Sequence, residues 1–236
     1  IEQRLADAGL PDDLKYLAVA ESALITRIDS HRGARGPWQF MTAAARSNGL
    51  RRDGVVDERL SFERSTDAAI QNLKRLHERF GSWALAMAAY NGGETRLSRS
   101  IRDQNTTDYY RLSLPLETER YVFRIAAIKI IMQDPERYGY FLSPGGSYDR
   151  KRFDVVKIKS AHSVPLLDLA GAIGTDFKAI KELNPQFLRD YVPRGTHTVY
   201  LPPALGIKLV NHLAAEDTRN PHVVLIASDR KEIRRH

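Results

Sequence analysis

One acidic residue stands where a helix would bury it. Glu21 follows the apolar stretch from Leu14 to Ala20. Helical steps back from it reach Ala18, Leu17 and Leu14, so its carboxyl group lies on the face that a helix turns toward the core. Burial raises the pKa of a carboxyl group because it penalises the charged form. A carboxyl group that keeps its proton near neutral pH can donate it to a leaving group, which is the task of a general acid.

The ordinary alternative is a partly solvated Glu that pairs with a nearby Arg, because perturbed carboxyl groups mark functional sites only statistically. Further blocks of polar, aromatic and glycine residues favour a functional role. They comprise Glu21-Ser22, Gly33 to Met41, Asp57-Glu58-Arg59 with Ser65-Thr66, Ala88 to Gly93, and Leu114 to Val122.

Taken in this order, the five blocks resemble those of the family 1 lytic transglycosylases of bacterial cell walls, in particular the membrane-bound lytic murein transglycosylase D group. The resemblance spans about residues 10 to 135. Each block alone is weak, whereas five in the right order at compatible distances are specific. The resemblance implies a mainly α fold, with a lysozyme-like, all-helical catalytic domain, and peptidoglycan glycan strands as the substrate.

The resemblance also implies a mechanism with one catalytic carboxyl group, whereas most glycosidases use two. Glu21 would protonate the bond between N-acetylmuramic acid and N-acetylglucosamine, while the substrate's acetamido group stabilises the positive charge. Glu21 would then take the proton of the sugar's own 6-hydroxyl as a 1,6-anhydro ring closes. Such a step requires a site that keeps water out.

Substrate-binding roles follow from the same matched positions. Ser22 would offer its hydroxyl to the N-acetyl group. Gln39 and Asn91 would hydrogen-bond substrate groups near the scissile bond. Tyr121 would orient the Glu21 carboxylate or the stabilising acetamide.

Each of two aromatic residues has two possible roles. Tyr90 either packs under the catalytic helix or contacts sugar, and Trp38 either stacks on a sugar face or fills the floor of the groove. Gly33, Gly36 and Gly92 are expected to serve special backbone conformations or close approach of the glycan.

A hydrolytic muramidase is the first alternative, because a second carboxylate would favour hydrolysis. The candidates are Asp29, Asp53, Asp57, Glu63 and Glu94, none of which falls in a matched catalytic position. The segment Asp57-Glu58-Arg59 is expected to build a structural ion-pair loop. The second alternative is a non-catalytic cell-wall glycan-binding protein, against which the presence of Glu21 argues.

Composition is consistent with an anionic partner. The 236 residues, 42% of them hydrophobic, can form one sizeable core plus a smaller module. A net charge of +7 suits a polyanion. Because Lys and Arg are scattered and no nucleic-acid motif is present, a wall polymer is favoured over nucleic acid. There is no cysteine, and the seven His residues lack a ligand spacing, so we predict no metal and no cofactor.

Location rests on the expected substrate, which places the protein in the periplasm or cell envelope. The chain has no run of about twenty apolar residues that would span a membrane. Because it begins at Ile1, any export signal or membrane anchor is expected upstream. A monomer is assumed.

Helical periodicity and capping residues predict the elements that position these blocks. We assign residues 1–142 to the catalytic domain and 143–150 to a linker. Helices are expected over about 1–8, 11–22, 38–47, 67–80 with a cap at Ser65 to Asp67, 83–90, 94–102 and 116–133.

Residues 151–203 are predicted to form a small α+β module, with strands near 153–158 and 198–203 around two short helices. The segment from Ile180 to Pro185 resembles the second-helix signature of a LysM module, whose family binds glycans containing N-acetylglucosamine. The usual Gly-Asp-Thr-Leu is replaced by Ser160 to Val164. Glycan binding therefore stays open, beside a degenerate module that only packs against the catalytic domain. Residues 204–236 are predicted as a helix, a strand over 223–227 and a basic end, as a join to a further LysM copy.

Overall fold

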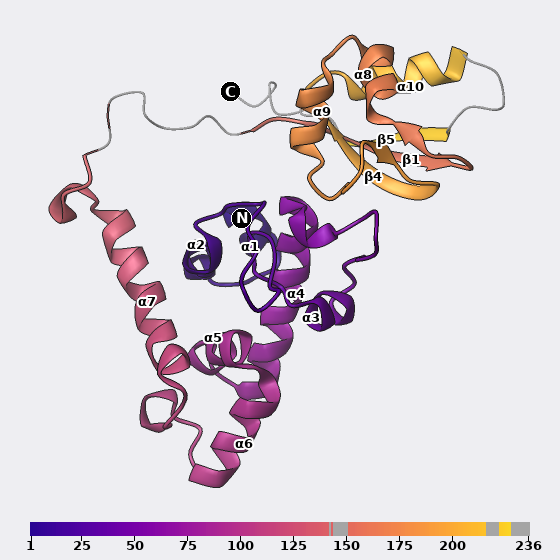
Figure 1. The fold of residues 1–236 in the computed structure, drawn as a ribbon. Coiled ribbons are helices and arrows are strands. Elements are labelled where there is room, and N and C mark those ends of the chain that lie inside the picture. Colours follow the sequence, from indigo (N-terminus) through magenta and orange to yellow (C-terminus); the bar gives the residue numbers. More distant parts are fainter. Residues whose placement is uncertain (142, 144–150, 216–221, 228–236) are drawn as a thin grey trace. The chain divides into compact units, whose positions relative to one another are not determined.

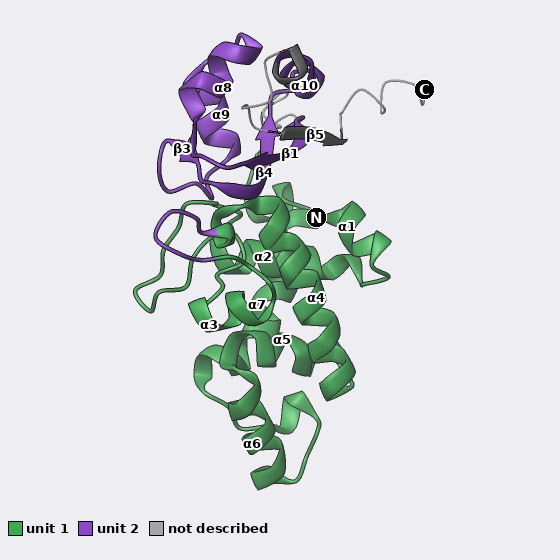
Figure 2. Ribbon diagram, turned by 90° about the vertical axis from the view of Figure 1, so that its right-hand side faces the viewer, with its two compact units in different colours: residues 1–51, 58–147 green, residues 52–57, 148–236 purple. Residues whose placement is uncertain are grey.

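The computed structural model describes residues 1–141, 143, 151–215 and 222–227. It consists of two compact units, residues 1–51 with 58–147 and residues 52–57 with 148–236 (Figure 2). Most of the predicted linker and the basic end at 228–236 lie outside the described residues. Within the described residues, no helix is both long and apolar enough to cross a membrane.

The first unit is helical, which confirms the predicted class of its fold. Figure 1 shows α4 as its longest helix, and α5 packs against both α4 and α7, while α2 packs on α7. The elements are α1 (Glu2–Asp7), η1 (Asp12–Leu14), α2 (Lys15–Ser22), α3 (Thr42–Ser47), η2 (Glu58–Leu60), α4 (Phe62–Phe80), α5 (Trp83–Gly92), α6 (Glu94–Gln104), η3 (Tyr109–Arg111), α7 (Leu116–Gln133) and η4 (Glu136–Tyr138).

Two helix starts differ from the prediction. The cap of α4 is Ser61, whose hydroxyl accepts a hydrogen bond from the Arg64 amide, whereas the hydroxyl of the predicted cap Ser65 donates to the Ser61 carbonyl within the helix at 2.6 Å. The helix predicted from Trp38 begins only at Thr42. Gln39 has a φ of 47°, which interrupts a helix there.

The second unit has a three-stranded antiparallel sheet in the order β4–β1–β5. Along β1, Asp154, Val156 and Ile158 point inward in the alternation of a half-buried strand. The elements are β1 (Asp154–Ser160), β2 (Val164–Pro165), α8 (Leu166–Ile173), α9 (Phe177–Leu183), β3 (Tyr191–Val192), β4 (Gly195–Leu201), α10 (Gly206–Ala215) and β5 (His222–Ala227).

The predicted strand, two helices and strand are thus present, and so is the later helix and strand. The sequence set residues 204–236 apart from the module, whereas β5 pairs with β1 and completes the module's own sheet. The short pair of β2 and β3 was not predicted.

A segment from far upstream belongs to this second unit. The Leu188 amide donates to the Val55 carbonyl at 3.0 Å, and the Asp57 amide donates to the Gln186 carbonyl at 2.9 Å. Val56 is fully buried in the same hydrophobic cluster as Phe187. The sequence placed residues 52–57 in the helical domain, because nothing in their types indicates a partner so distant along the chain.

Candidate active site

Glu21 lies in the last turn of α2, where the chain turns away at once. Ala23 and Leu24 both have positive φ angles, 49° and 64°, which end the helix. Leu17 and Ala18 are completely buried and anchor the helix in the core. Glu21 is therefore held at the point where a buried helix meets the surface.

The environment of Glu21 makes it a weaker acid than usual. Burial raises the pKa of Glu21 from 4.5 to about 7, and the charge of Glu117 adds to this rise. The Tyr121 hydroxyl, which donates a hydrogen bond to Glu21 Oε1, and the Arg124 charge both act in the opposite direction. Near neutral pH both the protonated and the ionised form of this carboxyl group are populated. Such a group can act as an acid in one step and as a base in the next.

Two tyrosines accompany this carboxyl group. Burial raises the pKa of both Tyr121 and Tyr90 well above 10, with the charge of Glu21 as a further cause. Both phenols therefore remain neutral donors. The Tyr90 hydroxyl donates to the Trp38 carbonyl at 2.7 Å, so its polar end is committed to the protein, which favours the packing reading.

Ser22 connects the end of α2 to the following loop, and Trp38 connects that loop to α4. The buried Ser22 hydroxyl donates to the Pro37 carbonyl at 2.7 Å. Trp38 has 0% exposure, and its indole Nε1 donates to Thr66 Oγ1 at 2.9 Å. A side chain without exposed surface cannot stack on a sugar in this conformation, which favours the reading of Trp38 as the floor of the site.

The loop that carries Gln39 is shaped by a glycine and a buried arginine. Gly36 has a φ of 81°, and a Cβ there would lie 1.9 Å from the Arg59 carbonyl oxygen, so only glycine fits. Arg59 Nη1 donates to the carbonyls of Gly33 and Phe40, both at 3.0 Å. Gln39 Nε2 donates to the Gly36 carbonyl at 2.8 Å, and this leaves the amide oxygen of Gln39 as its available acceptor.

Asn91 is positioned by a residue that the sequence analysis did not single out. Thr118 Oγ1 donates to Asn91 Oδ1 at 3.0 Å, and the backbone carbonyl of Thr118 accepts from the Tyr109 hydroxyl at 2.8 Å. A Cβ on Gly92 would lie 2.8 Å from Thr118 Oγ1, so this glycine lets α5 and α7 approach closely. Thr118 lies inside the Leu114 to Val122 block, which was the available signal.

The proposed second carboxylates are engaged elsewhere. Asp29 accepts from Arg35 at 2.6 Å, and Glu94 accepts from Arg75 and Arg79, both at 2.8 Å.

Asp53 accepts from the amides of Val55 and Val56 at 2.8 Å, and Asp57 is buried in the second unit. Burial raises the pKa of Glu63 as well, but the charges that act on it are those of Arg4, Asp67 and the N-terminus.

The carboxylate whose charge reaches Glu21 is Glu117, which the sequence analysis did not consider. It lies in the first turn of α7, four residues before Tyr121, and is exposed. In the segment Asp57-Glu58-Arg59, which was predicted to form an ion-pair loop, Glu58 Oε1 pairs with Arg64 Nε at 3.4 Å. Among the described residues, no three His, Cys, Asp or Glu side chains are grouped as metal ligands.

Family models match both parts of the chain. Residues 1–113 match the model described as Transglycosylase SLT domain, and residues 152–218 match the model described as Lytic transglycosylase MltD, LysM-like domain. The chain therefore carries an SLT transglycosylase domain followed by an MltD-type LysM-like domain.

A particular relative is similar over both domains. Membrane-bound lytic murein transglycosylase D of Escherichia coli (strain K12) is 31% identical over 181 residues, which cover 75% of this chain and 39% of that protein. The chain thus spans about two fifths of the length of this relative.

Two solved structures are more distant. The 70 kDa soluble lytic transglycosylase of Escherichia coli aligns with a TM-score of 0.49 at 22% identity, covering 58% of this chain and 24% of that chain. An inactive variant of lytic transglycosylase Slt from Pseudomonas aeruginosa aligns with a TM-score of 0.44 at 20% identity, covering 57% and 23%.

Proposed function

We propose that this chain is a peptidoglycan lytic transglycosylase that cleaves the β-1,4 bond between N-acetylmuramic acid and N-acetylglucosamine without water. The observation that carries the proposal is the carboxyl group of Glu21, whose pKa is raised to about 7 by burial and which accepts a hydrogen bond from Tyr121. The SLT and MltD-type matches support the same class of reaction.

In the first step protonated Glu21 transfers its proton to the glycosidic oxygen as the bond to the anomeric carbon breaks. The bonding electrons leave with that oxygen, and the substrate's acetamido oxygen stabilises the positive charge left on the sugar. In the second step the sugar's 6-hydroxyl oxygen bonds to the anomeric carbon while its proton returns to Glu21. The product ends in 1,6-anhydro-N-acetylmuramic acid, and the enzyme is regenerated.

The remaining polar residues would bind the sugars on either side. The Ser22 hydroxyl donates its hydrogen bond to the Pro37 carbonyl. Its oxygen would therefore accept a hydrogen bond from the acetamido N–H of the substrate. The amide groups of Gln39 and Asn91 would bind substrate groups near the scissile bond, with Asn91 held by Thr118. Tyr121 orients the Glu21 carboxyl group, while Trp38 and Tyr90 form the floor beneath it.

A hydrolytic muramidase is the second candidate, favoured by one observation. Glu117 is a carboxylate whose charge acts on Glu21, and a second carboxylate near the first is what a hydrolytic route needs. Its exposure argues against it, because a solvated carboxylate close to Arg32, at 3.9 Å, is poorly placed to activate one particular water.

The deciding experiment is mass spectrometry of the muropeptides released from purified peptidoglycan. Products lighter by one water that end in the 1,6-anhydro sugar, and that disappear with Glu21→Gln, support the transglycosylase. Reducing-end products instead identify a muramidase, and Glu117→Gln would then be the next variant. No release by the wild-type chain would favour a wall-binding protein. We place this activity in the cell envelope, where its substrate lies, as the membrane-bound relative suggests.

A further inference from the structure

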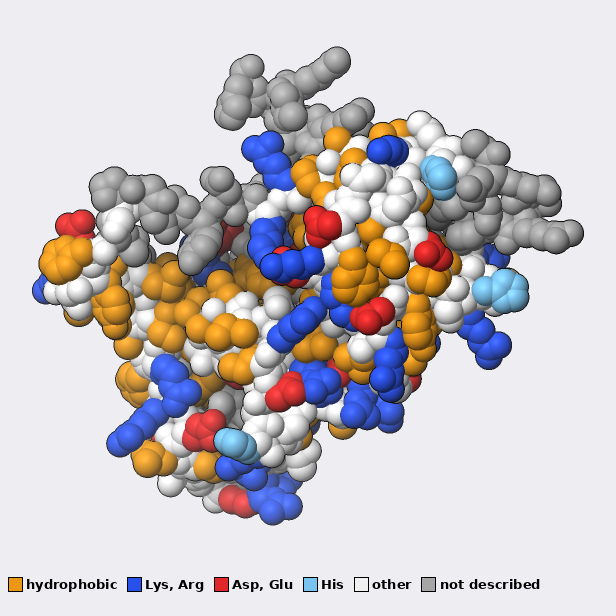
Figure 3. Space-filling view, turned by 45° about the horizontal axis from the view of Figure 1, so that its top comes forward, with side chains coloured by type: hydrophobic (Ala, Val, Ile, Leu, Met, Phe, Trp, Pro, Cys, Tyr) orange, Lys and Arg blue, Asp and Glu red, His pale blue; other side chains and the backbone are white. Residues whose placement is uncertain are grey.

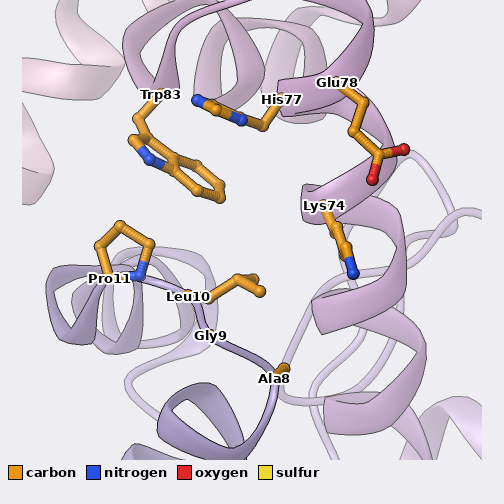
Figure 4. Close-up of a pocket in the computed structure, with 8 residues that line it drawn as sticks. All are labelled: Ala8, Gly9, Leu10, Pro11, Lys74, His77, Glu78 and Trp83. Carbon is orange, nitrogen blue, oxygen red and sulfur yellow. The ribbon is translucent and has the colours of Figure 1, made fainter.

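A hollow in the first unit lies among residues that the proposed mechanism does not use. Its volume is about 640 Å³, and it lies between the turn after α1, the C-terminal part of α4 and the start of α5 (Figure 4). The residues that give it chemical character are Leu10, Pro11, Lys74, His77, Glu78 and Trp83. Its volume falls within the range of small-ligand sites, roughly 300 to 1,000 Å³.

One side of the hollow is aromatic. The rings of His77 and Trp83 are stacked, with centroids 4.0 Å apart and an interplanar angle of 19°. In Figure 4 Leu10 and Pro11 lie across the open space from the indole of Trp83. The hollow is therefore a slot with an aromatic ring on one side and aliphatic surface on the other, which suits a flat ligand with apolar faces.

The polar side chains lie at one end of this slot. Lys74 and Glu78 are exposed, and they are one helical turn apart on α4. Neither side chain has an ion pair or hydrogen bond with another described residue, so a strong donor and a strong acceptor both remain available to a ligand.

We propose that this slot is a second saccharide-binding site that takes a sugar ring of the glycan strand away from Glu21. A pyranose ring has two faces of C–H groups and an edge of hydroxyl and amide groups. Its face would lie on Trp83, while Lys74 donates to its oxygens and Glu78 accepts from its hydroxyls. This inference rests on the proposed function, because that function supplies a glycan polymer long enough to reach both sites.

A stem peptide is the competing occupant, and the slot fits it less well. An extended peptide needs a row of backbone donors and acceptors, whereas the walls here are the side-chain surfaces of Trp83, Leu10 and Pro11. Charge alone does not explain an occupant either, because a single Lys74 ammonium group is too little charge to select a polyanion.

The two tryptophans make the test specific. Trp38 is hydrogen-bonded to Tyr90, on which the Glu21 charge acts, whereas Trp83 lines the slot. The indole N–H signals of the two residues are followed by NMR in the Glu21→Gln variant, assigned with Trp83→Phe, while a chitotriose probe is added. We expect the Trp83 signal to titrate through direct contact with the sugar. The signal of the fully buried Trp38 should titrate indirectly, as sugar binds at the Glu21 site above it. Lys74→Ala combined with Glu78→Ala should weaken the Trp83 titration about tenfold and leave that of Trp38 unchanged.

The matched control is Lys178→Ala, an exposed lysine on α9 whose replacement should change neither titration. A Trp83 signal that stays constant while the Trp38 signal shifts would overturn the slot proposal and leave the proposed function intact. A Trp83 shift caused only by a muropeptide, and not by chitotriose, would also overturn it in favour of the peptide. If anhydro products fail to appear in the muropeptide assay while Trp83 still titrates, the proposed function fails alone.

Discussion

Two buried polar side chains, Glu21 in the first unit and Asn184 in the second, use their hydrogen-bonding capacity in opposite ways. In the first unit the Glu21 carboxyl group accepts one hydrogen bond among the described residues, from Tyr121, and burial raises its pKa to about 7. In the second unit Asn184 is fully committed: its amide nitrogen donates to the carbonyls of Ile180 and Tyr200, and its oxygen accepts from the Tyr200 amide and from Gln186.

Asp154 in the second unit is used in the same structural way. Its carboxylate Oδ2 accepts from the Gly206 amide at 2.8 Å and holds the start of α10. Buried polar groups whose partners are all internal stabilise a fold, whereas a buried group with unused capacity can act on a ligand. The difference shows why Glu21 has capacity left for a ligand, whereas Asn184 and Asp154 serve the fold.

The largest effect is expected from Glu21→Gln. The amide retains the shape of the side chain but has no proton to transfer, so turnover of peptidoglycan should fall by about a thousandfold or more. Circular dichroism should be unchanged. Glu63→Gln is the matched control, because Glu63 is another Glu of this unit whose pKa burial raises, yet its replacement should leave turnover intact. An equal loss of turnover in both variants would show that Glu21 has no special role among the buried Glu residues, and the comparison would fail.

The second unit should respond to Asn184→Ala with loss of stability. Truncation removes the hydrogen bonds that Asn184 makes to buried groups of Tyr200 and Gln186, at a cost of about 4 kcal/mol. Urea unfolding of the two-unit chain would measure it. Asn211→Ala, at an exposed position on α10, should change stability by less than about 0.5 kcal/mol. If the two variants behaved alike, the hydrogen bonds of Asn184 would not stabilise the second unit.

The raised pKa of Glu21 also makes the stability of the fold depend on pH. Between pH 4.5 and about 7 the unfolded Glu loses its proton while the folded one keeps it, so the wild-type fold loses stability as pH rises through this window. Glu21→Gln should therefore match the wild type below pH 4.5 and exceed it above pH 7 by at most about 3 kcal/mol. Thermal unfolding of both proteins at pH 4 and pH 8 measures the difference. A constant offset would show that the pKa is not raised.

Tyr121→Phe is expected to have the smallest effect on rate, but it tests a specific contact. The hydroxyl stabilises the carboxylate form of Glu21, so its removal should raise the pKa of Glu21 further. The alkaline limb of the rate profile should move to higher pH, and the maximal rate should fall about tenfold because the carboxyl group is less well oriented. A lower rate with an unmoved profile would mean that Tyr121 acts only by packing.

Local patterns in the sequence were enough for the features that depend on neighbours along the chain. The bounds of α7 agree with the prediction from Leu116 to Gln133, because Pro115 precedes it and apolar residues recur within it. The placement of Glu21 followed from helical periodicity in the same way. The α4 cap was wrong because several Ser and Thr residues there compete for one role, and only hydrogen-bond geometry distinguishes Ser61 from Ser65.

Contacts between distant segments decided the rest. The sequence could not predict three of these contacts: Thr118 with Asn91, the charge of Glu117 on Glu21, and the burial of Val56 with Phe187. The sequence by itself marked Glu21 as the candidate acid, from its place on a predicted helix face together with the five blocks that resemble a known family. It also indicated which elements carry Glu21, because periodicity and capping are local. Only the tertiary structure decided the pKa of that acid and the burial of Trp38, because both depend on which atoms far along the chain exclude water from them.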